Sequence, residues 1–257
     1  MSQTTIRIRD HSGVRWITLA RPERRNALDD RLVGELTAAL RDADRDPSVR
    51  VIALDADGPD FCAGADLEQT RDLVAGADAV GNLADASRLG DLFVTMRRLG
   101  KVIVAALHGR ALAGGAGLAT ACDIVVAADD ARLGYPEVQL ALVPAMVGAL
   151  LRRATGEKPG FALLALGEQI DAAEAVRLGL VTRVVPAARL RDEVGAMAAS
   201  LASRSPAALT LIKRLFYGQD GLSFEDAIGR GAEVNALARS TPDARAGVER
   251  FLERRRR

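Results

Sequence analysis

The sequence has 257 residues, of which 49% are hydrophobic and 27% are charged, and its formal net charge is +1 at pH 7. This length allows one large domain or two small ones with a sizeable core. The near-neutral charge argues against nucleic acid or an anionic membrane as a partner. No apolar run is long enough to cross a bilayer, and the first ten residues lack the apolar segment of a secretory signal. With two cysteines and two histidines scattered without ligand spacing, we expect a cytoplasmic protein without a metal site.

The first hundred residues predict strands that alternate with helices. Residues 6–9 and 14–19 favour a hairpin, and a helix that Asp29 or Asp30 can cap follows, with apolar positions on one face. A buried strand at 51–54 precedes a small-residue bend at 61–67, which enters a helix at Asp66. Residues 75–81 are rich in Ala and Gly, so we expect them to be loose and mobile, before a helix from about 83 to 99.

The central stretch, 102–137, combines an open turn with a carboxylate. A buried strand at 102–107 leads to a turn at 111–117, whose three glycines leave the backbone open to close approach. A short helix at 118–121, a strand at 124–128 and a turn ending on Glu137 follow. Backbone N–H groups at a helix start favour negative charge. A carboxylate within reach would therefore unite a charge-stabilising pocket with a proton-transfer group.

The rest of the chain becomes increasingly helical. Helices are expected to begin near 144, 157 and 171, and a last strand covers 180–185. From 186 onward the pattern is helical, with breaks at Pro206, at 218–221 and at Pro242. We therefore divide the chain into an α/β core, 1–190, and a C-terminal helical region, 191–257.

Two bends have the same predicted arrangement of backbone. Residues 63–66 and 113–116 each follow a strand and enter a helix, so each can offer one unencumbered backbone N–H. Two such donors aimed at one carbonyl oxygen form an oxyanion hole, in which the loss of one donor costs roughly 3–4 kcal/mol. The alternative is that the glycines only permit tight packing against strands.

Several segments together resemble the enoyl-CoA hydratase/isomerase (crotonase) superfamily, and their order and spacing match along nearly the whole chain. They are residues 19–28, 61–67, 109–123, 134–144 and 167–186. The resemblance implies an α/β fold, a crotonase-like spiral of ββα units with a C-terminal helical trimerisation region. It also implies an acyl-CoA thioester as substrate, no separate cofactor, and a homotrimer or a hexamer built as a dimer of trimers.

The resemblance assigns roles to individual residues. The N–H groups of Ala65 and Gly114 fall where the family binds the thioester oxygen, and Glu137 matches a catalytic glutamate that moves protons. Other positions fall where the family holds CoA or the acyl group. They are Glu23, Arg24 and Ala27 for the CoA chain, Ala63 for the adenine, Arg254 for the ribose phosphate, and Asp66, Leu67, Gly117 and Tyr135 to complete the substrate site.

One position departs from the family pattern. Hydratases of the family commonly carry a second glutamate where this chain has Gly117. Two carboxylates can divide the addition of water, whereas one can shuttle a proton between C4 and C2. We predict an enoyl-CoA hydratase acting on a 2-enoyl-CoA, with a Δ3,Δ2-enoyl-CoA isomerase that uses Glu137 alone as the alternative and a thioester hydrolase as a third possibility.

A rival of another class is a non-catalytic RNA-binding or scaffold protein that uses the arginines of 254–257. The near-neutral charge speaks against it, and so does the total of nine Phe, Tyr and Trp residues (six, two and one).

Overall fold

The computed structural model describes residues 4–76 and 78–256. Within these residues a six-stranded sheet has the order β1-β2-β3-β4-β6-β9, and a three-stranded sheet has the order β5-β7-β8. The strands of the large sheet are β1 Ile6–His11, β2 Val14–Leu19, β3 Val51–Ala56, β4 Val102–Leu107, β6 Ile124–Ala128 and β9 Arg183–Val185. Those of the small sheet are β5 Arg110–Leu112, β7 Arg132–Gly134 and β8 Gln169–Asp171.

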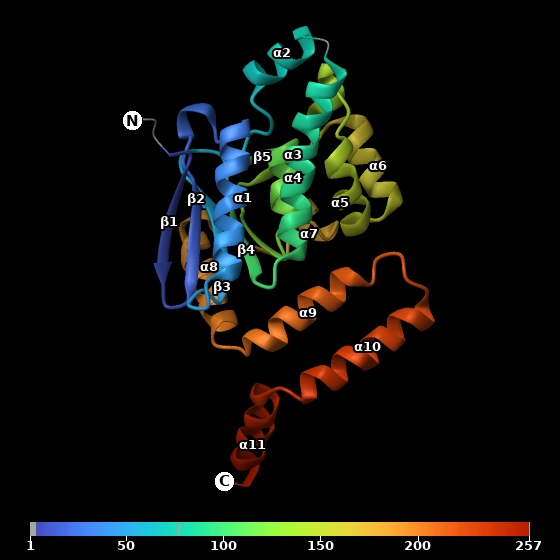
Figure 1. Ribbon diagram of the computed structural model, residues 1–257. Helices are drawn as coiled ribbons and strands as arrows, with labels where there is room; N and C mark the ends of the chain where they lie inside the picture. Colours follow the sequence, from blue (N-terminus) through green and yellow to red (C-terminus); the bar gives the residue numbers. More distant parts are fainter. Residues whose placement is uncertain (1–3, 77, 257) are drawn as a thin grey trace.

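Helices cover both faces of the large sheet (Figure 1). The α helices are α1 Asp30–Arg45, α2 Leu67–Gly76, α3 Ala79–Arg98, α4 Gly114–Ala121, α5 Ala145–Thr155, α6 Glu157–Leu166, α7 Ala172–Arg177, α8 Leu190–Ala202, α9 Pro206–Gly218, α10 Phe224–Arg239 and α11 Pro242–Arg256. Short 3₁₀ helices are η1 Pro22–Arg24, η2 Pro136–Leu140 and η3 Ala187–Arg189.

The alternation of side chains along β3 explains the two layers. Strand residues point to opposite faces in turn. Ile52 and Leu54 join the core cluster that contains the buried face of α1, whereas Val51 and Ala53 join a second cluster with α8. Because both faces are buried, the strand reads as a continuous apolar run. The predicted hairpin is confirmed, since β1 and β2 pair in antiparallel register, and β2, β3, β4, β6 and β9 continue the sheet in parallel.

Two helix boundaries differ from the sequence prediction. The segment at 75–81, predicted to be loose, is helical in most of its described residues: α2 continues to Gly76 and α3 begins at Ala79, while Ala77 lies outside the described residues. The Asp78 side chain accepts the N–H groups of Val80 and Gly81 and so caps α3. Helix α4 begins at Gly114, earlier than the predicted start at 118, so the glycine turn is itself the first turn of that helix.

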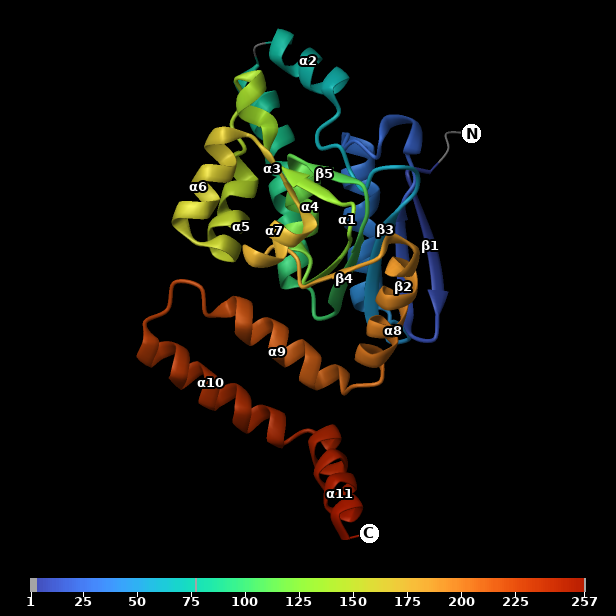
Figure 2. The same ribbon diagram turned by 180° about the vertical axis from the view of Figure 1, so that it is seen from behind.

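The last helices extend away from the core. Helix α9 lies below the core, α10 runs back beside α9, and α11 ends farthest from the sheet (Figures 1 and 2). A buried ion pair fixes α9: Lys213 Nζ lies 2.7 Å from Oδ2 of Asp123, which directly precedes β6. Helix α8 packs against the sheet, and the division of the chain at residue 190 stays a prediction. Across the described residues, no helix combines the length and the apolar character needed to span a membrane.

Candidate functional site

The two bends at residues 63–66 and 113–116 lie against each other. Gly64 has a φ of +94°, and a Cβ there would lie 2.8 Å from the Cβ of Ala113 and 2.8 Å from the carbonyl oxygen of Leu112. Glycine is therefore required at this contact for two reasons, the positive φ and the lack of space. A parallel bridge between Cys62 and Ala111 fixes the two segments just before they meet. The packing brings the backbones at Ala65 and Gly114 to one place.

The N–H groups of Ala65 and Gly114 are free to bind a ligand. The N–H of Leu28 donates to Gly64 O at 2.7 Å, and the carbonyl of Leu28 accepts the N–H of Asp66 at 2.9 Å, which leaves the intervening N–H of Ala65 facing away from Leu28. Gly114 is the first residue of α4, where N–H groups lack helical acceptors. Neither N–H donates to an acceptor within residues 4–76 and 78–256. Two unused donors on adjoining turns have the composition of an oxyanion hole.

Ala113 connects this pair of donors to the segment that carries Glu137. Its φ of +51° is unusual for a residue with a Cβ, and its N–H donates to Gly134 O at 2.8 Å. Gly134 is the last residue of β7, three positions before Glu137 on η2. The backbone strain at Ala113 thus lies where α4 and the carboxylate segment are tied together, a common place for strain in functional sites.

Glu137 is half-buried and incompletely bonded. Its Oε2 atom is buried and has no hydrogen-bond partner in the described part of the chain. Burial raises the pKa of the Glu137 carboxyl, and a bond from its own backbone N–H opposes this only in part. A buried polar atom without a partner calls for an explanation. A carboxyl that holds its proton more readily and keeps one oxygen free is suited to proton transfer.

Tyr135 supports this segment from inside the core. It is 1% exposed, and its hydroxyl lies 3.1 Å from Thr120 Oγ1. Because the Thr120 hydroxyl donates to Ala116 O at 2.8 Å, Tyr135 is the donor to Thr120. Burial raises the pKa of Tyr135 to about 12, so its hydroxyl stays protonated. Tyr135 therefore anchors the start of η2 to α4, behind Glu137.

Gly117 has no room for a larger side chain. A Cβ there would lie 2.4 Å from Val147 Cγ1 and 2.9 Å from Phe93 Cζ. Helices α5 and α3 therefore close the position at which the family resemblance implies a second glutamate. Sequence reasoning did not link Phe93 or Val147 to Gly117, because their positions show only apolar helical spacing.

The residues assigned to CoA, apart from Arg254, form one connected loop region around η1 and the start of α2. Ala63 donates its N–H to Arg25 O at 3.0 Å, and Arg24 pairs with Glu68 at 2.9 Å. Glu23 and Leu67 are exposed on this loop and on α2, whereas Ala27 is buried. Beside the N–H of Ala65, the region thus exposes the side chains of Glu23 and Leu67 and the cation of Arg24.

Two residues that hold this loop were not assigned a role from the sequence. Asn26 is fully buried, and its amide donates to Asp57 O and Asp60 O at 2.8 and 2.9 Å. Arg21 pairs with Asp66 at 3.2 Å, while Asp66 also accepts the N–H of Glu68. A signal for Asn26 was available, since asparagine is one of the residues that tolerate the left-handed φ of +55° found here.

Among the described residues with a predicted role in the site, Arg254 alone lies far from the core. It lies on α11, which projects away from the core in both ribbon views (Figures 1 and 2). Within one chain it does not join the loop at Glu23 and Arg24. In the described residues, no cluster of three or more His, Cys, Asp or Glu side chains could hold a metal ion.

Comparison with known proteins places the chain in a family. The sequence pattern of the family described as enoyl-CoA hydratase/isomerase matches residues 9–257. A Thermus thermophilus protein, provisionally named an enoyl-CoA hydratase, is 41% identical over 234 residues, which are 91% of this chain and 92% of that protein. The crystal structure of an enoyl-CoA hydratase from Mycobacterium smegmatis superposes with a TM-score of 0.94 at 34% identity, covering 98% of this chain and 97% of that one. This chain belongs to the enoyl-CoA hydratase/isomerase family and has its crotonase fold.

Proposed function

We propose that this chain is an enoyl-CoA hydratase that adds water across the double bond of a 2-enoyl-CoA. The observation that carries the proposal is Glu137, a half-buried carboxyl with a raised pKa and an unpaired oxygen. Through Ala113 and Gly134 it is tied to the turn that bears the free N–H of Gly114. The names of the relatives agree with this reaction.

The reaction begins at the thioester carbonyl. The N–H groups of Ala65 and Gly114 bind its oxygen and stabilise the negative charge that develops there. The Glu137 carboxylate takes a proton from water while the hydroxide oxygen bonds to C3, and the electrons of the double bond move onto the thioester oxygen. The carboxyl of Glu137 then returns the proton to C2, and the carbonyl re-forms. The net change is the addition of one water, and the carboxylate is regenerated.

The closed position at Gly117 favours a second candidate. With Phe93 and Val147 occupying the space beside Gly117, Glu137 is the one carboxylate that we assign to the reaction. A single carboxylate suffices to move a proton from C4 to C2, which is the Δ3,Δ2-enoyl-CoA isomerase reaction. Neither reaction as written needs a metal or a prosthetic group, because CoA enters as part of the substrate.

Mass spectrometry separates the two reactions. The protein is incubated with 2-enoyl-CoA and 3-enoyl-CoA esters in ordinary and in deuterated water. A product heavier by one water from the 2-enoyl ester supports the hydratase. Conversion of the 3-enoyl ester without a change in mass in ordinary water would replace it by the isomerase. Free CoA would indicate a hydrolase, and no turnover of any ester would contradict the proposed chemistry.

We further propose a cytoplasmic homotrimer or a dimer of trimers. The support is the exposed apolar surface of the last helices: Phe216 on α9 and Phe224 and Ile228 on α10 are between 60% and 76% exposed. A surface of this kind on extended helices fits contact with other copies. A neighbouring copy could also receive Arg254, which its own chain holds apart. Sedimentation equilibrium gives the mass directly, and a monomer at micromolar concentration would contradict this assembly.

A further inference from the structure

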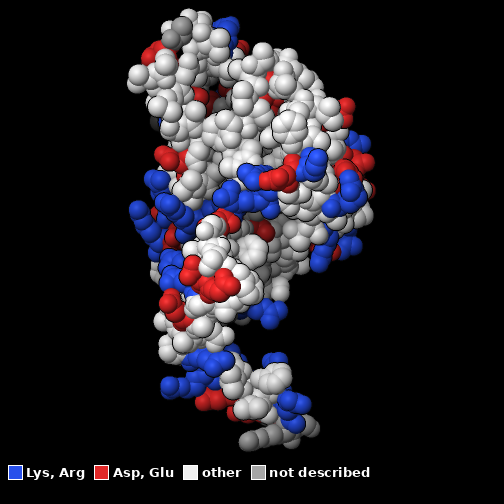
Figure 3. Space-filling view, turned by 90° about the vertical axis from the view of Figure 1, so that its right-hand side faces the viewer, with Lys and Arg blue, Asp and Glu red and all other residues white. Residues whose placement is uncertain are grey.

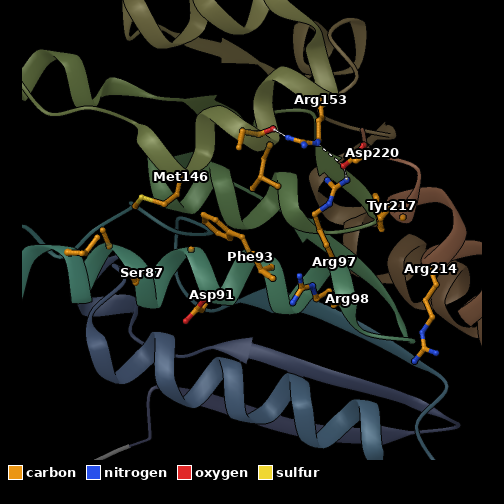
Figure 4. Close-up of a pocket in the computed structure, with 17 residues that line it drawn as sticks. Ser87, Asp91, Phe93, Arg97, Arg98, Met146, Arg153, Arg214, Tyr217 and Asp220 are labelled. Carbon is orange, nitrogen blue, oxygen red and sulfur yellow. Dashed lines mark hydrogen bonds and ion pairs between the residues drawn. The ribbon is translucent and has the colours of Figure 1, made fainter. Parts of the chain in front are cut away.

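A large groove lies between α3, α5 and α9 (Figure 4). Its volume is about 1190 Å³. Apolar side chains form one part of its wall, among them Phe93, Met146 and Leu150. Arginines form another part: Arg97, Arg98, Arg153 and Arg214 contribute four positive charges, and Asp91 and Asp220 contribute two negative ones, so the lining carries a net +2.

The side chain of Phe93 separates the groove from the glycines of α4. Phe93 lines the groove, and a Cβ on Gly117 would lie 2.9 Å from its Cζ atom. Leu89 on the same helix is one of two neighbours that a Cβ on Gly114 would meet, at 3.3 Å, the other being Leu28 at 3.2 Å. Arg97 follows Leu89 by eight residues, about 12 Å along a helix axis at the usual rise per residue. An acyl chain whose thioester oxygen is bound at Gly114 can therefore point along α3 towards Arg97.

The arginines are held in place but are not fully neutralised. Asp220 Oδ2 lies 2.7 Å from Arg153 Nε and 3.5 Å from Arg97 Nη2, so one carboxylate is shared by two guanidinium groups. Arg97 is also stacked over the ring of Tyr217, 4.0 Å from its centroid. Each guanidinium has five N–H donors, and more remain than one carboxylate can accept.

Two further arginines add charge at the same groove. Arg98 and Arg214 are exposed and form no ion pair with any described residue of the chain. In the space-filling view, basic side chains gather in a band across the middle of the molecule, where the core meets the helical tail (Figure 3). This face therefore presents positive charge next to an apolar floor.

We propose that this groove receives the distal end of the acyl chain and selects acyl chains that end in a carboxylate. The inference rests on the proposed acyl-CoA substrate and names its class, a dicarboxylic acyl-CoA. A plain hydrocarbon end would displace water from the guanidinium groups without replacing its hydrogen bonds. A carboxylate accepts two N–H donors of one arginine in parallel and retains those bonds.

Matched pairs of esters test this selection. We compare kcat/KM for 2-enoyl-CoA esters of six and eight carbons with and without a terminal carboxylate. The ratio within each pair is expected to favour the carboxylate by about tenfold or more, as for a charge-assisted hydrogen bond. Arg153→Gln and Arg98→Gln should each lower that ratio. Asp220→Asn should raise it, because it releases Arg97 and Arg153.

Arg152→Gln is the control. Arg152 is next to Arg153 on α5, does not line the groove and pairs with Glu157, so its loss removes the same charge from the same helix. The ratio should not change in this variant. Because each ratio compares two esters on one protein, a partly unfolded variant does not distort it.

Binding separates a failure of this inference from a failure of the proposed reaction. Calorimetry with adipyl-CoA and hexanoyl-CoA needs no turnover, and the inference expects adipyl-CoA to bind more tightly. Tighter binding without turnover of any ester would sustain the inference and remove the proposed reaction. Equal affinities and equal kcat/KM values would overturn the inference while the hydratase stands. It would also be overturned if Arg153→Gln changed the oligomeric mass and left the ester ratio unaltered, since the groove would then be an interface between copies.

Discussion

Replacing Gly117 by Ala should destabilise the protein, although alanine is the better helix former. Gly117 lies inside α4 and does not have a positive φ, so helix propensity alone predicts a gain of about 1 kcal/mol. The new Cβ would lie 2.4 Å from Val147 Cγ1 and 2.9 Å from Phe93 Cζ. Overpacking of a buried site costs about 1–3 kcal/mol, so we expect a net loss of up to about 2 kcal/mol in the free energy of unfolding.

Urea unfolding followed by circular dichroism measures this loss. Gly148→Ala on α5 is the matched control, because a Cβ there would meet a single atom, Leu164 Cδ1, at an ordinary 3.5 Å. That variant should gain stability. Val147→Ala should make room, so that Gly117→Ala costs less in its presence. If Gly117→Ala gained as much as Gly148→Ala, Phe93 and Val147 would not close this position, and a second carboxylate could be accommodated there.

Three further predictions follow from the same contacts. Glu137→Gln should lower kcat by about 10²–10⁴-fold and leave CoA-ester affinity by calorimetry nearly intact; loss of both would indicate a structural role. Because burial raises the pKa of Glu137, its contribution to stability is present at low pH and is lost as the pH rises through the folded-state pKa. Glu137→Gln should therefore raise Tm at about pH 8 but not near pH 4, and an equal rise at both would contradict this assignment. Lys213→Met leaves Asp123 buried without its partner and should cost about 3–5 kcal/mol in urea unfolding. Arg230→Gln, which breaks an exposed pair with Glu233, should change stability by less than about 1 kcal/mol, and equal effects of the two variants would refute the role given to the buried pair.

Local sequence patterns predicted most of the helices and strands of the fold. The apolar runs that become β3 and β4 predict buried strands, because both faces of a parallel sheet are covered. Asp29 caps α1 as predicted, since its side chain accepts the N–H of Leu32. The short strands β5, β7 and β8 were not predicted. At three residues each they are too brief for a periodic pattern, and they pair because the larger sheet brings them together.

Some residues of the site were likewise predicted from the sequence, and others are placed only by the packing of helices. The sequence singled out Glu137, Gly114 and Ala65, because a carboxylate and two small-residue bends that follow strands are local features. Nothing local could place Arg254, whose distance from the core depends on how α10 and α11 leave it. The arginines of the groove lie on α3, α5 and α9, and only the packing of these helices brings them to one space.

The sequence by itself determined which segments become strands and helices, which turns leave N–H groups open, and which carboxylate follows them. Periodicity, capping and glycine placement act over a few residues, so they can be read along the chain. Only the tertiary structure decided that Gly64 meets Ala113, that Phe93 and Val147 close the space beside Gly117, and that Glu137 keeps an unpaired oxygen. Those results depend on side-chain volume and on the removal of water, and both are properties of contacts between segments that lie far apart in the sequence.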